Sequence, residues 1–102
     1  MTTAIEPALG RLFDLAKSDT GQARRVANFL LAWWNGDDWG YFDIADLFGL
    51  DSAVAADMAT VFSFLATHPG AIYADAFGYR HDMAELVERW RPEPTVAHAT
   101  AA

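Results

Sequence analysis

The chain has 102 residues, no cysteine and a formal net charge of −7. Its length predicts one domain with a modest core. The lack of cysteine excludes disulfide bonds, thiolate catalysis and cysteine-ligated zinc. Because no long apolar run or basic-then-apolar N-terminus is present, we expect neither a membrane span nor a secretion signal, and we expect a cytoplasmic location.

The acidic excess lies in the middle of the chain. No Lys or Arg occurs between Val26 and Tyr79, and this segment holds seven aspartates: Asp37, Asp38, Asp43, Asp46, Asp51, Asp57 and Asp75. The flanking segments carry seven acidic and seven basic residues, so they are balanced. The negative electrostatic field of these aspartates would repel nucleic acid and attract basic protein surfaces. An acidic surface also favours solubility, which is the alternative explanation.

The first predicted helix starts at Glu6-Pro7, since proline at the first helical position loses no hydrogen bond. Its apolar residues recur at helical spacing, at Leu9, Leu12, Phe13 and Ala16. Lys17 suits the negative end of the helix dipole. Residues 18–21 then form a break before the next helix.

A central amphipathic helix is predicted within residues 18–35. Asp19 and Gln22 have capping-box spacing at its start. One face carries Val26, Phe29, Leu30 and Trp33. Asn35-Gly36 is typical of a helix end, since both residues tolerate the left-handed conformation.

Two neighbouring tryptophans end this helix. We expect Trp33 in the core, because a buried indole removes a large apolar area from water. For Trp34 the core and an exposed binding platform both remain open. Trp34 and Leu31 lie off the main apolar stripe, which would suit a homodimer interface.

Residues 36–50 are predicted to form a loop and one short helix. Asp43 has the character of an N-cap, with Asp46 in the first turn where the helix dipole favours negative charge. Phe42 and Leu47 have the spacing of a hydrophobic staple. Gly49 ends this helix.

Asp51 is predicted to cap a longer helix that ends at His68-Pro69, since a residue before proline is driven out of helical geometry. Its apolar positions are Val54, Met58, Val61, Phe62 and Leu65. Residues 71–79 are expected to be irregular with one helical turn, and a short strand at residues 71–73 is the alternative.

The last predicted helix has Asp82 and Glu85 at capping-box spacing and ends at Pro92 and Pro94. Its apolar positions are Met83, Leu86, Val87 and Trp90. The expected fold is therefore all-α, a compact, antiparallel-leaning bundle of four main helices and one short helix. We expect one domain over residues 1–92 and a disordered tail over residues 93–102.

No motif for catalysis or cofactor binding is present, so we expect no enzymatic activity, no cofactor and no metal. The histidines, His68, His81 and His98, lack zinc-ligand spacing. Residues 35–46 partly match a calcium loop, with Asn35, Asp37, Gly40 and Asp43 at acceptable positions. However, Trp39 offers no side-chain oxygen at its position, and Asp46 is too short for the bidentate ligand.

The favoured hypothesis is a protein-interaction domain with an acidic face. Trp and Tyr are common anchors of interfaces. The candidate partner-binding residues are Asp37, Asp38, Trp39, Tyr41, Asp43 and Asp46, which would face a basic protein surface. The alternatives are a homo-oligomer with a structural or regulatory role and, against the net charge, nucleic-acid binding through Arg24 and Arg25 with Arg11.

Four segments carry a family resemblance: SDTGQARRVANFLLAWWN at residues 18–35, FDIADLF at 42–48, DSAVAADMATVF at 51–62 and WRPE at 90–93. The chain resembles a family of small uncharacterised proteobacterial proteins often associated with plasmids and integrated mobile elements. The resemblance covers most of residues 11–93. It implies no activity and no site residue; it implies the context of an accessory protein of mobile DNA, in which inhibition of a defence complex, as by anti-CRISPR proteins, or nucleic-acid mimicry is conceivable.

Overall fold

The computed structural model describes residues 4–92. Within them the chain forms four α-helices and two short 3-10 helices and no strand: α1 Ile5–Ala16, α2 Gly21–Trp39, η1 Ile44–Gly49, α3 Ser52–Thr67, η2 Ala74–Phe77 and α4 Arg80–Trp90. The predicted all-α class is thus confirmed, as are the short helix after Asp43 and the helical turn within residues 71–79. The predicted tail, residues 93–102, lies outside the described residues.

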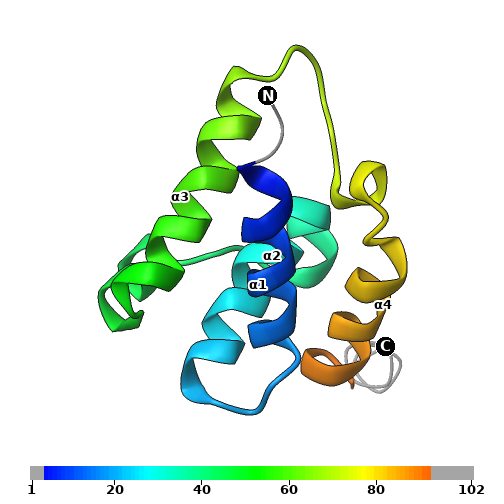
Figure 1. The fold of residues 1–102 in the computed structure, drawn as a ribbon. Helices are drawn as coiled ribbons and strands as arrows, with labels where there is room; N and C mark the ends of the chain where they lie inside the picture. Colours follow the sequence, from blue (N-terminus) through cyan, green and yellow to red (C-terminus); the bar gives the residue numbers. More distant parts are fainter. Residues whose placement is uncertain (1–3, 93–102) are drawn as a thin grey trace.

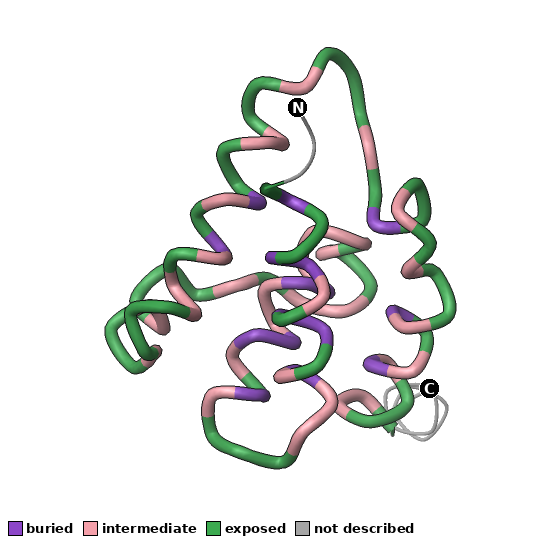
Figure 2. Tube along the Cα trace, viewed as in Figure 1, coloured by how far each residue is buried: buried purple, intermediate pink, exposed green. Residues whose placement is uncertain are grey.

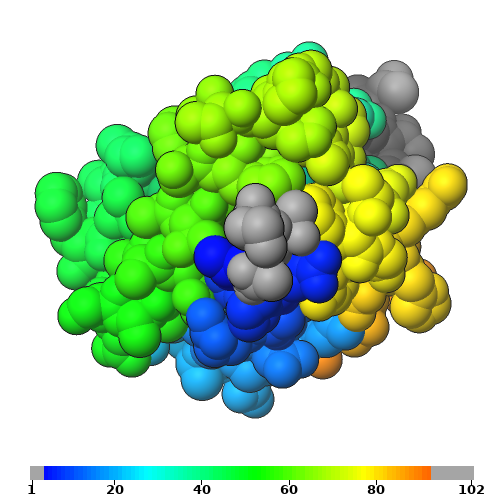
Figure 3. All heavy atoms as spheres, turned by 45° about the horizontal axis from the view of Figure 1, so that its top comes forward, coloured from blue at the N-terminus to red at the C-terminus, as the bar shows by residue number. Residues whose placement is uncertain are grey.

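The helices pack as a row in the order α3, α1, α2, α4. The closest packing joins α1 to both α2 and α3, and α2 to α4. Neighbours in this row run antiparallel, as Figure 1 shows. Seen from the end where α1 begins, α3 and residues 71–79 border α1 on two sides (Figure 3). The row therefore has two inner helices, α1 and α2, and two outer helices, α3 and α4.

The core is built mainly by α1 and by the first half of α2. Burial along the trace is dense on these helices and sparse on α3 (Figure 2). The largest fully buried side chains are Phe13, Ile5, Leu9, Leu12, Leu30, Leu31, Met83, Leu86, Val26 and Val61. Phe13 also stacks on Tyr79, with ring centroids 4.4 Å apart, which joins α1 to the start of α4.

The N-terminal boundaries of two helices differ from the predicted ones. Thr20, not Asp19, caps α2, and its hydroxyl accepts a hydrogen bond from the Ala23 amide at 3.1 Å. The Gln22 side chain instead bridges to α3: its amide nitrogen donates to the Asp51 carboxylate, and its oxygen accepts from the Asp51 amide. Capping-box spacing was misleading here because a partner distant in sequence competes for the same glutamine.

The helix α4 begins two residues before the predicted cap, with Tyr79 as its N-cap. Asp82 is therefore inside the first turn, where its carboxylate accepts from the Lys17 ammonium across to the end of α1. This hydrogen bond raises the pKa of Lys17. At the other end, the Trp90 indole donates to the Ala16 carbonyl at 2.8 Å.

Candidate functional site

An apolar groove of about 600 Å³ lies between the second half of α2, residues 41–47 and α3. Among the described residues that line it, none is charged: Phe29, Ala32, Trp33, Tyr41, Phe42, Ile44, Leu47, Ala55, Met58, Ala59, Phe62 and Leu65. Alanines at three of these positions leave room for another backbone to approach. Exposed apolar surface of this kind typically marks a place where something binds.

The groove exists because α3 packs against α1 while a second apolar side of α3 stays uncovered. Met58 and Val61 are buried, and they are the only buried residues of this sixteen-residue helix. Phe62 follows directly and is 67% exposed. The side of α3 that carries Ala55, Ala59 and Phe62 therefore faces the groove rather than the core.

Residues 41–47 form the opposite wall. The ring of Phe42 packs edge-on against Phe29 of α2, with centroids 5.4 Å apart. Asp43 caps η1 as predicted, accepting from the Ala45 amide at 3.0 Å. Phe42 and Leu47 are half-buried, whereas Ile44 is 71% exposed at the rim. This wall is thus held against the rest of the molecule by Phe42 and Leu47, and the Ile44 side chain between them is exposed to solvent.

The helix α2 is interrupted at Asn35, where the sequence predicted its end. Asn35 has extended rather than left-handed backbone angles, and one further helical turn, which was not predicted, follows as far as Trp39. The Asn35 side-chain oxygen accepts from the Asp38 amide, which caps this extra turn. The interrupted helix places Asp37, Asp38 and Trp39 on a helical turn instead of the predicted loop.

Gly36 lets the Tyr41 ring lie directly on this last turn. A Cβ atom at Gly36 would come within 2.7 Å of a ring carbon of Tyr41. The Tyr41 hydroxyl donates to the Asp37 carboxylate, and this hydrogen bond raises the pKa of Tyr41. Tyr41 is therefore held in place although it is 72% exposed.

The adjacent tryptophans of α2, Trp33 and Trp34, are half-buried, and each donates a hydrogen bond. The Trp33 indole donates to the Ile72 carbonyl at 3.0 Å and packs against the core, close to its predicted place. The Trp34 indole donates to the Asp75 carboxylate at 3.0 Å. Leu31 is fully buried, so its predicted place at a homodimer interface was wrong; it faces the core because the packed face of α2 is wider than its main stripe.

The six predicted partner-binding residues do not form one continuous face. Asp37 and Tyr41 lie together at the groove, and Asp43 is placed between two groove-lining neighbours in the chain. Asp46 pairs instead with Arg25 of α2 at 3.8 Å. Asp38 bonds with Asn35. Trp39 is half-buried against the core, and its carbonyl accepts from Arg91 at 2.9 Å.

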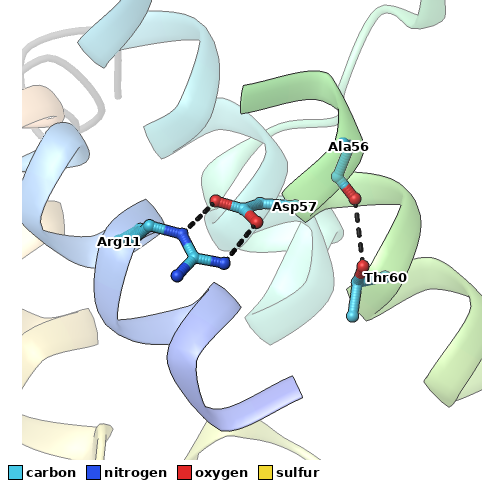
Figure 4. A network of polar contacts seen from close by, with 4 residues as sticks. All are labelled: Arg11, Ala56, Asp57 and Thr60. Atoms are coloured by element: carbon cyan, nitrogen blue, oxygen red, sulfur yellow. Dashed lines mark hydrogen bonds and ion pairs between the residues drawn. The ribbon is translucent and has the colours of Figure 1, made fainter. Parts of the chain in front are cut away.

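Other central aspartates also have local partners. Asp57 forms two hydrogen bonds of 2.9 Å with Arg11, which tie α3 to α1 (Figure 4). These bonds raise the pKa of Arg11. Thr60, on the next turn of α3, donates to the Ala56 carbonyl in the same view. Part of the acidic excess thus stabilises helix packing rather than a free surface.

Sequence reasoning missed the contribution of α3 to the groove. Phe62 and Leu65 were grouped with Met58 and Val61 as the apolar positions of one helix, although they line the groove together with Ala55 and Ala59. The available signal was the width of the apolar surface: Met58, Ala59, Val61 and Phe62 cannot all face one neighbouring helix.

Of the two arginines near the start of α2, Arg25 has an ion-pair partner among the described residues, and Arg91 lies close to Arg24. Arg91, just after α4, donates to the Asn28 side chain at 2.7 Å as well as to Trp39. Burial lowers the pKa of Arg91, and the nearby charge of Arg24 lowers it further. Arg25 pairs with Asp46, which leaves Arg24 as the exposed member of the predicted Arg24-Arg25 patch.

Within residues 4–92, no three His, Asp or Glu side chains converge in a way that would hold a metal ion. Residues 36–39 of the calcium-like stretch form a helical turn rather than part of a loop. His81 is exposed, His68 packs near Phe64, and His98 lies outside the described residues. No helix of the described chain is long and apolar enough to cross a membrane.

The fold and the groove define a small all-α protein with an exposed apolar groove. The chain belongs to a family of unknown function, DUF7673, whose model matches residues 6–91 and so spans all four α-helices. Comparison with curated proteins and with solved structures gives no match.

Proposed function

We propose that the protein is a non-enzymatic interaction domain that binds a partner protein in the groove between α2 and α3. The observation that carries the proposal is the combination of an apolar lining with high exposure at Phe62, Ile44 and Tyr41. Apolar and aromatic anchors in a partly desolvated depression supply most of the free energy in protein interfaces. The acidic residues next to the groove, Asp37 and Asp43, favour a partner with a basic surface.

The chemistry of the groove favours a protein partner over a small-molecule substrate. Small-molecule sites fix their ligands with a few convergent polar groups. Among the described lining residues the Tyr41 hydroxyl is the one polar side-chain group besides the Trp33 indole, and both already donate hydrogen bonds within the chain.

The family resemblance adds a biological context to this proposal. On a plasmid or an integrated element, an acidic interaction domain would act in the cytoplasm by binding a host or defence protein and modulating or inhibiting it. An anti-CRISPR-like role and mimicry of nucleic-acid charge both belong to this class. The excess of aspartate between Val26 and Tyr79 supports it.

Self-association is the second candidate, because the same groove offers apolar area to another copy of the chain. It would make the protein a structural or regulatory homo-oligomer. Direct nucleic-acid binding through Arg24 and Arg25 has less support, since Arg25 is paired with Asp46.

The test is affinity capture from a proteobacterial lysate with the full chain and two matched variants. Phe62→Ser removes an exposed phenyl group that lines the groove. Phe48→Ser removes one that is 92% exposed on η1 and is not among the lining residues. We expect one stoichiometric partner that is retained by wild type and Phe48→Ser and lost with Phe62→Ser. A partner that both variants retain would show that the groove is not the binding site.

Sedimentation separates the second candidate from the first. A dimer at micromolar concentration that Phe62→Ser dissociates would assign the groove to a second copy of the chain. A monomer, together with a captured partner, would assign it to another protein.

A further inference from the structure

We infer that the occupant of the groove is an amphipathic helix of the partner that carries Lys or Arg beside its apolar anchors. This inference rests on the proposed function and adds the chemistry of the bound segment. It depends on three features of the groove: its length along α3, the small residues in its lining, and the charge of the segment that forms it.

The length of the groove matches a short helix. Its lining on α3 runs from Ala55 to Leu65, which corresponds to about 15 Å along the helix axis. Anchors at positions i, i+4 and i+7 of a docked helix span about 10 Å. A partner helix of about three turns would therefore place all of its anchors within the groove.

The small residues favour a helix over an extended peptide. Ala55 and Ala59 are one turn apart on α3, and Ala32 lies across the groove on α2. Alanines in this arrangement let a third helix approach both walls, as helices do when they pack in bundles. An extended peptide that binds by adding a strand to a sheet would need a strand edge, and residues 4–92 contain no strand.

The charges beside the groove favour a basic helix. Two aspartates of the central segment, Asp46 and Asp57, are paired with arginines, whereas Asp37 and Asp43 have no ion-pair partner among the described residues and lie next to lining residues. A second, polar depression of about 450 Å³ shares Trp33 and Tyr41 with the groove and is lined also by Asp37. The Asp37 carboxylate accepts from Tyr41 and keeps further acceptor positions, so a lysine extending from the groove can reach it.

The same charge argues against a second copy of the chain as occupant. In a symmetric dimer the same patch lies on both sides of the interface, so both copies would bring Asp37 and Asp43 to it. Like charges placed together in this way oppose association.

The experiment is a selection of peptides against the full chain. The probe is a displayed library of helical peptides about 14 residues long, with randomised positions and with counter-selection against Phe62→Ser. We expect the enriched peptides to carry apolar residues at i, i+3 or i+4, and i+7, flanked by Lys or Arg, and to gain helicity on binding. Enrichment of acidic, charge-neutral or non-helical peptides would overturn the inference.

Matched variants then test the charge. In the double variant Asp37→Asn/Asp43→Asn each residue keeps a side-chain oxygen for its present hydrogen bond and loses its charge. The control is Glu6→Gln/Asp14→Asn on α1, which removes two charges from exposed residues that do not line the groove. We expect the affinity for a selected peptide to fall about tenfold in the first variant, with a weaker salt dependence, and to stay unchanged in the control. If both variants lost the same affinity, the effect would come from the net charge of the protein rather than from Asp37 and Asp43, and the inference would be overturned.

The two proposals fail in different ways. Capture of a partner that needs Phe62, but through a segment that is not a basic helix, would leave the interaction function in place and refute this inference. A captured partner that binds independently of Phe62 would refute both. A dimer that Phe62→Ser dissociates would give the groove to a second copy and refute the inference of a basic helix.

Discussion

The helices α1 and α3 pack against each other, but they bury very different shares of their apolar residues. Six of the twelve residues of α1 are buried, because α1 lies between α2 and α3. Of the sixteen residues of α3 only Met58 and Val61 are buried, although most of the helix is apolar. The difference shows that α3 has more apolar surface than the described chain covers, and that surplus forms the groove.

The largest effect on the free energy of unfolding is expected when a leucine of the core is replaced, in comparison with a leucine beside the groove. Leu30 is fully buried on α2, whereas Leu65 is half-buried beside the groove. Leu30→Ala should lower the free energy of unfolding by about 2–5 kcal/mol, since it leaves a cavity. Leu65→Ala should cost less than half as much, because solvent or neighbouring side chains fill the space. Urea unfolding measures both; equal losses would show that the groove is as tightly packed as the core.

The next effect concerns the junction between α2 and the groove wall. Gly40 has φ +100° and ψ 163°, a region that is almost restricted to glycine. Gly40→Ala should therefore destabilise the chain by about 1–3 kcal/mol. Gly21→Ala is the control, since a Cβ there meets no atom within 4 Å. Thermal unfolding of both variants compares them, and an unchanged melting temperature in Gly40→Ala would contradict the backbone argument.

A third effect concerns pH, because the two outer helices, α3 and α4, are each tied to α1 by a different basic residue. Lys17 joins α1 to α4 through Asp82, and Arg11 joins α1 to α3 through Asp57. The pKa of Lys17 is raised in the folded state, so its stabilising contribution is full below the unfolded pKa of about 10.4 and is lost as pH rises through the folded pKa. Arg11 stays charged throughout this range, and its pKa is raised further.

Alkaline solution should therefore loosen α4 before α3. Methyl NMR spectra recorded above pH 10 would show it as shifts at Met83 and Leu86 that precede those at Met58 and Val61. Lys17→Met should show the α4 changes already at neutral pH. Simultaneous shifts in both helices would mean that the ion pair to Asp82 contributes nothing specific to α4.

The smallest effect on stability is expected at the proposed binding surface. Phe62 is 67% exposed, so Phe62→Ser should change the free energy of unfolding by no more than about 0.5 kcal/mol. Circular dichroism with urea titration checks this, with Phe48→Ser as the comparison. A loss of several kcal/mol would mean that Phe62 belongs to the core, and the contrast between α1 and α3 would then disappear.

Local patterns in the sequence were sufficient for the helices and for several of their ends. Asp43 and His68 lie where capping and proline rules placed them, because both depend on neighbours within a few residues. The caps at Asp19 and Asp82 were wrong for the opposite reason: Gln22 bonds to Asp51, and Asp82 bonds to Lys17, 65 residues away.

The candidate site was predicted in part. Tyr41 and Asp37 were identified from exposed aromatic and acidic residues, and they do lie at the groove. Trp39 and Asp46 were not separable from them, because the contacts that engage them, with Arg91 and with Arg25, join residues far apart in the sequence. The contribution of α3 was missed because apolar periodicity does not reveal which of two apolar sides a neighbour will cover.

The hydrogen bonds that hold α4 join segments that are far apart in the sequence. Trp90 reaches Ala16 across 74 residues, and Arg91 reaches Asn28 across 63. Contacts of such separation close long loops, and the entropy of loop closure opposes them until the whole contact has formed. Helix formation needs only neighbours within a few residues, so the docking of α4 onto α1 and α2 should set the rate at which the chain folds.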